Sequence, residues 1–333
     1  MQKRTVAFSK HASNLFFHIL TRCNLACAHC YINPAQHGSA RLSIDTIEQW
    51  LALFARRNPD SNVIFLGGEP TLHPDLFRAV RYARQLGYTS ITIDTNGYLF
   101  HDILDRITPD DVDFISFSLD GATPETNDAI RGKGCFDQVV AGIRTARQKG
   151  FSCSMIYTVS EHNIHELAQM PELISTMGLE RFFIQVIGLR GESSKDNTLQ
   201  VSRRIWLDVI PGVAHTIAES GITVTYPKVF LDPGQDFECA GNVAQNYFVF
   251  PNGRVYQCPV CEDYALHSYE IRNNELVSMP PVNESDLFKL SIPEGCVMNK
   301  LVQPGNIEYL PDGRPAWKIA CCLLKEELSN RCP

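Results

Sequence analysis

The sequence predicts an α/β fold in which a partial (β/α)6 barrel, TIM-like in plan, carries a small cysteine-rich C-terminal domain with a β-hairpin. Short apolar runs alternate with amphipathic stretches, this alternation repeats six times, and most cysteines cluster near the two ends of the chain. Strands that alternate with helices form right-handed βαβ units and a parallel sheet. Six repeats fall short of the eight of a full barrel, so we expect an open, curved sheet.

Each element follows from its local pattern. Apolar runs predict six strands, over residues 15–20, 62–66, 90–94, 114–119, 152–159 and 181–187. Amphipathic stretches predict six helices, over residues 43–57, 75–86, 101–107, 136–149, 165–177 and 202–220. Ser43 is a suitable N-cap for the first helix, and Gly87 follows the second as a C-terminal glycine. We expect Cys135 in a loop and Cys153 in a strand.

Composition limits the class of protein. The 333 residues suggest an N-terminal extension (1–13), the barrel (14–225) and the cysteine-rich domain (226–333). A net charge of −7 argues against a large nucleic-acid surface. No run reaches the roughly 18 apolar residues of a membrane span, and the N-terminus lacks the apolar core of a signal peptide. We therefore expect a cytoplasmic protein, in which 12 cysteines indicate metal binding and not disulfides.

Three cysteines form a C-x3-C-x2-C motif directly after the first predicted strand: Cys23, Cys27 and Cys30. Three thiolates this close can bind three irons of a cubane iron–sulfur cluster and leave one iron without a protein ligand, whereas electron-transfer clusters usually take four thiolates. The open iron can bind a substrate or cofactor. Ligands of open α/β sheets bind beyond the carboxyl ends of the strands, so the motif lies at the predicted functional edge.

Other polar residues follow the predicted strands at this edge. They are Gly67-Gly68-Glu69-Pro70 after the second strand, Asn96 after the third, Ser118 and Asp120 after the fourth, and Gln185 in the sixth. Adjacent glycines allow a backbone to approach a ligand closely, and a glutamate offers a carboxylate. Alternatively, the Gly-Gly-Glu-Pro run is an ordinary turn, and the polar strand residues are hydrogen-bonded core groups.

Together these motifs resemble the radical S-adenosylmethionine (SAM) superfamily, over about residues 14–225. The resemblance implies a [4Fe-4S] cluster held by Cys23, Cys27 and Cys30, whose open iron chelates the amino and carboxylate groups of SAM. It further implies reductive cleavage of SAM to a 5′-deoxyadenosyl radical, which abstracts hydrogen from a substrate C–H bond. The electron would come from a donor such as flavodoxin or ferredoxin.

The resemblance also implies contacts to SAM. The backbone of Gly67–Pro70 and the Glu69 side chain would bind the SAM amino group. His29 stands where the family often has an aromatic residue, and with Tyr31 it would lie near the adenine. Residues that would hold the ribose and carboxylate ends, or line the site, are Asn96, Ser118, Asp120, Arg131 and Gln185. A loop salt bridge is the alternative role for Arg131.

The C-terminal cysteines form a second group. Two strand-like runs around Pro251-Asn252-Gly253 predict a β-hairpin that presents Cys258 opposite the Cys239 loop. This arrangement resembles the first half of a SPASM domain, or its shortened relative, the twitch domain, which carries one cluster. It implies one auxiliary [4Fe-4S] cluster, held by Cys239, Cys258, Cys261 and one of Cys296, Cys321 or Cys322. The alternative is a structural zinc site, and Cys332 is expected to be an unliganded thiol.

The resemblance favours an oxidative modification or maturation of a peptide, a protein or a cofactor or natural-product precursor. Radical group transfer, such as adenosylation or C–C or C–S bond formation, is the alternative reaction. A non-catalytic zinc-binding module is the alternative of another class. Four residues are candidate general acids or bases, and the sequence does not rank them: Asp94, Asp120, Tyr157 and Glu192.

Overall fold

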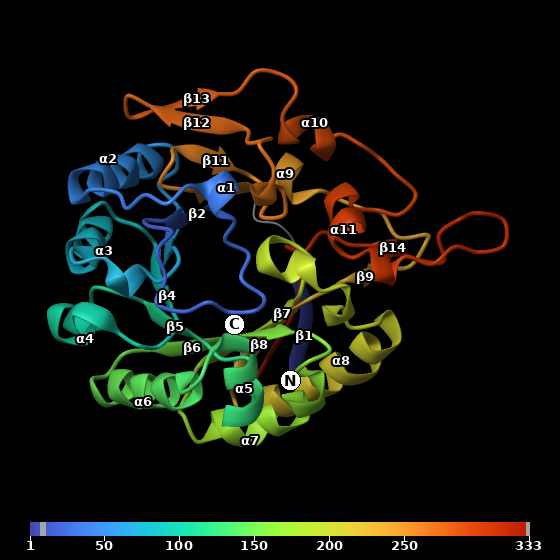
Figure 1. Ribbon diagram of the computed structural model, residues 1–333, viewed down its shortest axis with the longest axis horizontal. Coiled ribbons are helices and arrows are strands. Elements are labelled where there is room, and N and C mark those ends of the chain that lie inside the picture. The colour runs from blue at the N-terminus through green and yellow to red at the C-terminus, as the bar shows by residue number, and fades with distance from the viewer. Residues whose placement is uncertain (7–10, 331–333) are drawn as a thin grey trace.

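Parallel strands in sequential order form the centre of the structure, a computed structural model that describes residues 1–6 and 11–330 (Figure 1). The six predicted strands are present as β2 (Ser13–His18), β3 (Ser61–Leu66), β4 (Ser90–Thr95), β5 (Phe114–Ser118), β6 (Cys153–Val159) and β7 (Arg181–Val186). A seventh parallel strand that the sequence patterns did not predict, β8 (Thr223–Pro227), pairs with β7. The partial parallel barrel is therefore confirmed, with one strand more than expected.

Helices that connect the parallel strands pack around the outside of the curved sheet (Figure 1). They are α2 (Ile44–Ala55), α3 (Leu76–Gln85), α4 (Ile103–Arg106), α6 (Cys135–Gln148), α7 (Met170–Ser175) and α8 (Arg203–Glu219). Ser43 caps α2 as predicted, because its side chain accepts a hydrogen bond from the backbone N–H of Thr46. Helix and strand therefore alternate as the sequence pattern requires.

Four local predictions were wrong. The helix expected over 165–177 is a 3₁₀ segment, η3 (Ile164–Gln169), followed by α7, whose first turn contains a proline that favours a helix start there. The helix expected over 101–107 is shorter, because His101 has a left-handed φ of 57°. Cys135 is the first residue of α6 and does not lie in a loop. Helix α5 (Pro124–Arg131), begun by the N-cap Thr123, was not predicted.

The C-terminal segment extends the central sheet at both edges. Strand β10 (Gln245–Val249) pairs in parallel with β2, and β11 (Arg254–Tyr256), β12 (Tyr269–Arg272) and β13 (Glu275–Ser278) continue from it. At the other edge, β15 (Lys325–Ser329) pairs antiparallel with β8, and β1 (Gln2–Val6) pairs with β15. The predicted hairpin is thus β10–β11. The division at residues 13 and 225 stays a proposal, since strands from both outer segments join the barrel sheet.

Shorter elements connect these parts. They are α1 (Pro34–His37), α9 (Ala240–Val243), α10 (Glu284–Phe288), α11 (Val297–Val302), η1 (Pro70–Leu72), η2 (Phe100–Asp102), η4 (Gly191–Lys195), η5 (Asn197–Leu199), η6 (Cys261–Asp263), η7 (Pro304–Asn306) and the pair β9 (Phe230–Leu231) and β14 (Lys318–Ile319). Helices α9, α10 and α11 lie together beside the barrel with the C-terminal strands (Figure 1).

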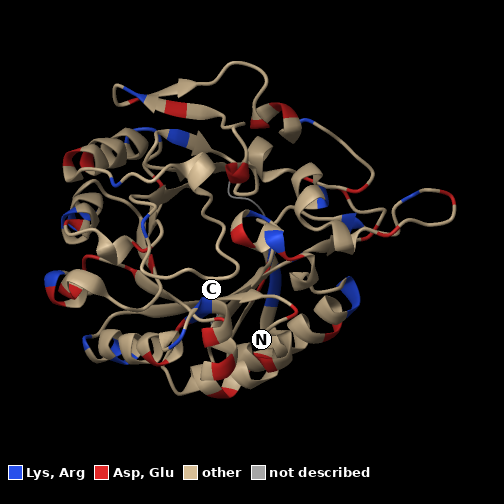
Figure 2. Ribbon diagram, in the orientation of Figure 1, with Lys and Arg blue, Asp and Glu red and all other residues tan. Residues whose placement is uncertain are grey.

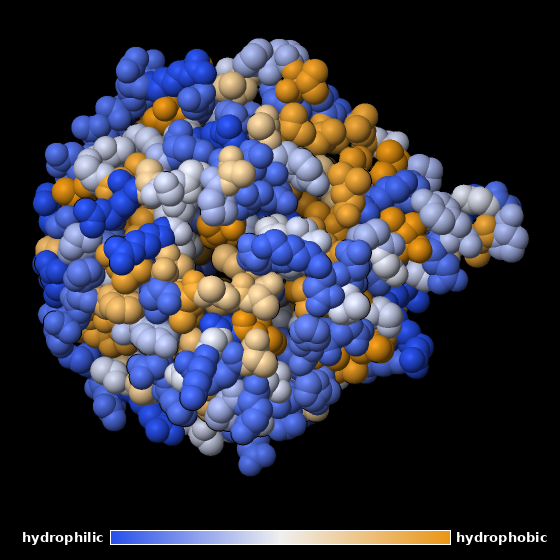
Figure 3. Space-filling model, in the orientation of Figure 1, coloured by the Kyte–Doolittle hydropathy of each residue, from blue (hydrophilic) through white to orange (hydrophobic). Residues whose placement is uncertain are grey.

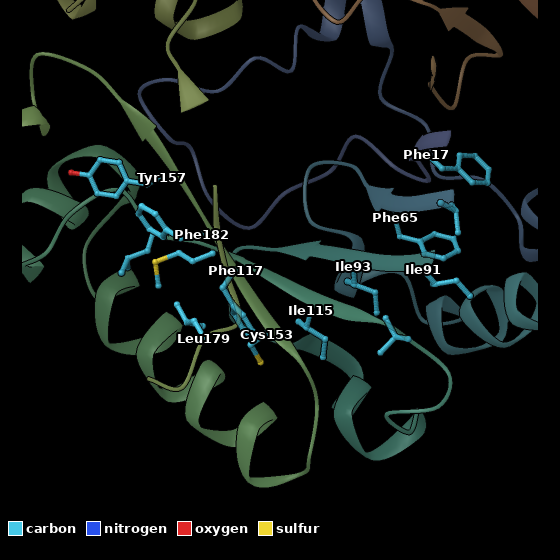
Figure 4. Packing of buried hydrophobic residues seen from close by; sticks show 14 of the residues in the cluster. Phe17, Phe65, Ile91, Ile93, Ile115, Phe117, Cys153, Tyr157, Leu179 and Phe182 are labelled. Atoms are coloured by element: carbon cyan, nitrogen blue, oxygen red, sulfur yellow. The ribbon is translucent and has the colours of Figure 1, made fainter. Parts of the chain in front are cut away.

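The main core fills the space between the sheet and its outer helices (Figure 4). Phe65, Phe117 and Phe182, from three different strands, are each fully shielded from solvent. Phe117 packs against α6 at Gly142, where an added Cβ would lie 3.2 Å from the Phe117 ring. Burial of these apolar faces is the dominant force that holds the helices on the sheet.

Charged residues of both signs are interspersed over the outer helices (Figure 2). Within residues 1–6 and 11–330, no helix is both long and apolar enough to cross a membrane.

Truncation of Phe117 tests this core. We expect Phe117→Ala to lower the free energy of unfolding by about 3–5 kcal/mol, because it removes buried apolar contacts and leaves a cavity. Leu207→Ala, at a position 43% exposed on α8, is the control and should cost less than about 1 kcal/mol. Urea denaturation followed by circular dichroism measures both, and equal losses would contradict the packing described for Phe117.

Candidate active site

A cavity of 380 Å³ lies where the parallel strands end, and the C-terminal segment covers it. Figure 3 shows a hollow in the middle of this face with apolar residues around it. Of the predicted site residues, those that line the cavity are Cys23, Cys27, His29, Cys30, Tyr31, Gly67, Gly68, Glu69, Asn96, Ser118, Arg131 and Gln185. Pro70 and Asp120 do not line it. The structure therefore brings both sequence motifs to one cavity.

Hydrogen bonds of the backbone hold the loop that carries the three cysteines. The N–H of Ala28 donates to the carbonyl of Ile130 at 2.9 Å, and the N–H of Glu192 donates to the carbonyl of Cys30 at 2.8 Å. All three thiols are partly buried. Burial raises the pKa of each of them, that of Cys27 to about 12. A metal that binds here would have to displace these protons, since the thiolate is the ligand form.

The two glycines after β3 allow this loop to pack against the next one. A Cβ on Gly67 would lie 2.4 Å from the carbonyl oxygen of Leu20, and one on Gly68 would lie 2.3 Å from that of Arg22. The N–H of Gly68 donates to Leu20 at 3.1 Å, and the N–H of Glu69 donates to Arg22 at 3.0 Å. The glycines therefore allow the loop after β3 to lie against the backbone of residues 20–22, which leads into the cysteine loop.

Glu69 is a structural link between loops. Its buried carboxylate accepts hydrogen bonds from the N–H and hydroxyl of Thr71, the hydroxyl of Thr95 and the N–H of Asn96. Burial raises its pKa although these donors favour the ionised form. Three of these donors bond Oε1 and only the N–H of Asn96 bonds Oε2, so the expected contact of Glu69 with the SAM amino group stays a prediction.

Asp120 supports two cavity residues from behind. Its Oδ2 accepts from Nε of Arg131 at 2.5 Å and lies 3.0 Å from Nε2 of His29, and its Oδ1 accepts from the N–H of Thr158 at 2.7 Å. Burial alone would raise the pKa of Asp120, but the charges of Arg131 and His29 and these hydrogen bonds outweigh it and hold the pKa at about 2. Asp120 is thus a positioning residue, and its expected place among the cavity groups was wrong.

The aromatic residues near the cysteine loop have defined partners. The Tyr31 hydroxyl lies 2.7 Å from Nε2 of His18, and the Arg190 guanidinium lies 4.8 Å from the Tyr31 ring centre. Nδ1 of His29 is buried and has no hydrogen-bond partner in the described structure. The expected place of His29 near the adenine stays a prediction, and His29 does line the cavity.

One of the four candidate acid–base residues lines the cavity. Asp94, on β4, does so, and burial raises its pKa to about 7. The Tyr157 hydroxyl instead donates to the carbonyl of Asn163 at 2.8 Å away from the cavity, and Glu192 pairs with Lys195 at 2.6 Å on the surface. Asp120 is occupied as described above. The geometry therefore ranks Asp94 first.

The C-terminal cysteines surround a second cavity of 30 Å³. The thiols on its wall are Cys239, Cys258, Cys296, Cys321 and Cys322. Cys261 does not line it, and is instead fully buried in an apolar cluster under the hairpin. Its thiol is nevertheless close enough to that of Cys258 to interact with it, so the expected ligand set with Cys261 stays a prediction. No three His, Cys, Asp or Glu residues among those described are grouped to hold a single metal ion. Cys332 lies outside the described residues.

Sequence reasoning missed several residues of the first cavity. They are His18, Arg190, Glu262 and Lys325, and Cys322, which was expected only at the auxiliary cluster, lines this cavity too. Glu262, Cys322 and Lys325 come from the C-terminal segment, and only the tertiary packing brings them to the barrel. His18 offered a signal, because it is a polar side chain within the otherwise apolar run over residues 15–20.

Comparison with known proteins identifies the barrel. The model of the radical SAM superfamily matches residues 17–174, which contain both sequence motifs of the cavity. The chain belongs to the radical SAM superfamily. Members of this superfamily use a [4Fe-4S] cluster together with SAM, and membership does not favour the zinc-module alternative.

Relatives extend the match beyond the barrel. Mycofactocin maturase MftC of Mycobacterium tuberculosis is 31% identical over 279 residues, which cover 76% of this chain and 65% of that protein. Pre-heme d1 synthase of Dinoroseobacter shibae is 29% identical over 55% of this chain and 45% of its own length. The chain thus spans about half to two thirds of the length of these relatives.

Solved structures show the same fold over most of the chain. Streptococcus suis SuiB bound to its precursor peptide SuiA superposes with a TM-score of 0.68 at 12% identity, over 88% of this chain and 74% of SuiB. Native anSMEcpe with bound AdoMet gives a TM-score of 0.60 at 16% identity, over 87% of this radical SAM chain and 82% of its own. Both matches include the C-terminal segment.

Substitution of Gly68 tests the packing of the two loops. We expect Gly68→Ala to displace the cysteine loop and to reduce the iron bound after anaerobic reconstitution by about half, if a second cluster is retained. Gly212→Ala is the control, because a Cβ there, on α8, meets no atom within 4 Å. Iron analysis and far-UV circular dichroism measure both variants. Full iron content in folded Gly68→Ala would show that the close approach is not needed.

Proposed function

We propose that this chain is an enzyme that cleaves SAM reductively and modifies a C–H bond of its substrate. The observation that carries the proposal is that Cys23, Cys27 and Cys30 share one cavity wall with Gly67 and Gly68. Three thiolates from one loop suit a cluster with one open iron. When bound, the cluster and SAM together supply a 5′-deoxyadenosyl radical, the species that removes hydrogen from the substrate.

The residues of the chain position the cofactors and exclude water. Arg131 and His29 are fixed by Asp120, so their orientations are set before a ligand arrives. The backbone after β3 and the side chains of Asn96, Ser118 and Gln185 offer hydrogen-bonding groups for SAM in the same cavity. The N–H of Asn96 is held by Glu69 at 2.7 Å, and its side chain donates to Asn24 at 2.7 Å. These two hydrogen bonds fix the orientation of Asn96 at the cavity.

The C-terminal thiols suit an auxiliary [4Fe-4S] cluster of the SPASM or twitch type. We infer that four of the five thiols on the small cavity would hold it, with Cys239, Cys258, Cys296 and one of the adjacent Cys321 and Cys322 as the set. Cys322 lines both cavities, so the two sites share a wall. A cluster behind that wall would be placed to accept an electron from a substrate in the large cavity.

An oxidative modification fits this two-site arrangement better than group transfer, because an electron acceptor beside the substrate permits a net oxidation. MftC is named a maturase, and SuiB was solved with a precursor peptide. We therefore propose oxidative maturation of a peptide, a protein or a small precursor. A flavodoxin or ferredoxin would supply the electron, and the cytoplasm is the proposed compartment.

Replacement of Cys27 tests the main proposal. Wild-type protein, reconstituted anaerobically and mixed with SAM and dithionite, should form 5′-deoxyadenosine. Cys27→Ala should reduce its formation by at least about 100-fold, because one of three cluster ligands is lost. Cys153→Ala, at a buried strand position outside both cavities, is the control and should retain activity. Product from folded Cys27→Ala at the wild-type rate would refute the assignment.

The auxiliary site has its own test. We expect Cys296→Ala to lose about four irons per chain, whereas Cys261→Ala should keep them because its thiol does not reach the cavity. Iron and sulfide analysis measures both variants. Loss of iron in Cys261→Ala but not in Cys296→Ala would restore the ligand set expected from the sequence.

A further inference from the structure

Lys325 is a cation in the large cavity that has no anionic partner. Among the described residues that line the cavity, the other two Arg or Lys side chains are paired. Arg131 is 2.5 Å from Asp120, and Arg190 is 2.9 Å from Glu262. Lys325 forms no such pair with any described residue, and its Nζ lies 6.0 Å from the centre of the Phe183 ring. Burial lowers the pKa of Lys325, and the nearby Cys322 and Asp94 offset this effect only in part.

Asp94 is an acidic side chain of the cavity that forms no ion pair with a described residue, as Lys325 is a basic one. Glu262 is paired with Arg190, and Glu69 accepts four hydrogen bonds, whereas Asp94 has no cationic partner within ion-pair distance among the described residues. Asp94 and Lys325 are close enough to influence each other electrostatically but form no ion pair. The cavity therefore holds a basic and an acidic side chain that form no ion pair with the described residues, and a buried charge of this kind is costly unless a ligand completes it.

Lys325 and the cysteine loop lie at opposite ends of the strand order of the sheet. That loop follows β2 at one end of the seven parallel strands, whereas Lys325 lies on β15, beyond the other end, opposite Pro227 of β8. Pro227, Leu323 and Val186 give this part of the cavity apolar surface. An apolar wall with a single fixed charge is typical of a site that recognises one polar group of an organic ligand.

We propose that Lys325 binds a carboxylate of the substrate. This inference rests on the proposed function, because it assigns the β15 side of the same cavity to the substrate. The ligand class is a monoanion, since a single lysine balances one negative charge, and the carboxyl group of Asp94 nearby would repel the second charge of a dianion such as a phosphate monoester whenever Asp94 is ionised. A peptide that enters with its C-terminal carboxylate or an acidic side chain has this chemistry, as does a small carboxylic acid.

Binding of small probes tests the proposal without turnover. Benzoate, neutral benzamide and phenyl phosphate are titrated calorimetrically into reconstituted protein saturated with SAM. Benzoate should bind more tightly than the other two. Lys325→Met should weaken benzoate binding by about tenfold or more, and Lys325→Arg should retain most of it. Lys228→Met is the matched control, because Lys228 lies outside the cavity, 3.8 Å from Glu326.

Other outcomes would overturn the proposal. Equal benzoate affinity in Lys325→Met, or no preference for benzoate over benzamide in the wild type, would show that Lys325 binds no carboxylate. Tighter binding of phenyl phosphate would change the ligand class to a phosphate. A tenfold loss of SAM affinity in Lys325→Met would assign Lys325 to the carboxylate of the cofactor. Formation of 5′-deoxyadenosine by the wild type separately tests the proposed function, so the two can fail independently.

Discussion

The packing of three loops against one another at the ends of β2, β3 and β4 is the constraint on which the site depends. The backbone of Gly67 and Gly68 lies so close to Leu20 and Arg22 that no side chain fits between them. Glu69 then joins this pair of loops to the third through Thr95 and Asn96. A carboxylate buried with four donors is stable only while all of them stay in place, so the three loops are fixed together. The cysteines take their positions from this frame.

The C-terminal segment turns an open half-barrel into an enclosed site. Its strands extend the sheet beyond β2 on one side and beyond β8 on the other. Between these strands it contributes Glu262, Cys322 and Lys325 to the cavity wall. The second group of thiols is thereby placed directly behind the first cavity. The two cavities are adjacent at Cys322, which lines both of them.

The charged residues near the site fall into two groups, those that accept several hydrogen bonds from the protein and those that form no ion pair with its described residues. Asp120 and Glu69 are both buried carboxylates near the site, and each accepts several hydrogen bonds from protein donors. Asp94 and Lys325 are less satisfied by the protein, and both reach the cavity. An unsatisfied charge in an enclosed space is energetically unfavourable, which is why we assign these two to ligand binding and the first two to positioning.

The sequence by itself determined the barrel strands, the C-x3-C-x2-C motif and the glycine turn, because each depends on local periodicity or spacing. It also placed the β10–β11 hairpin, since a Pro-Asn-Gly turn between apolar runs is a local signal. It did not determine β8, the exclusion of Cys261 from the second cavity, or the roles of Glu69 and Asp120. Only the tertiary structure decided these, because they depend on which side chains meet across the fold. Lys325 is the clearest case: it is an ordinary strand residue until β15 pairs with β8 and brings it to a cavity whose motifs lie some 300 positions earlier.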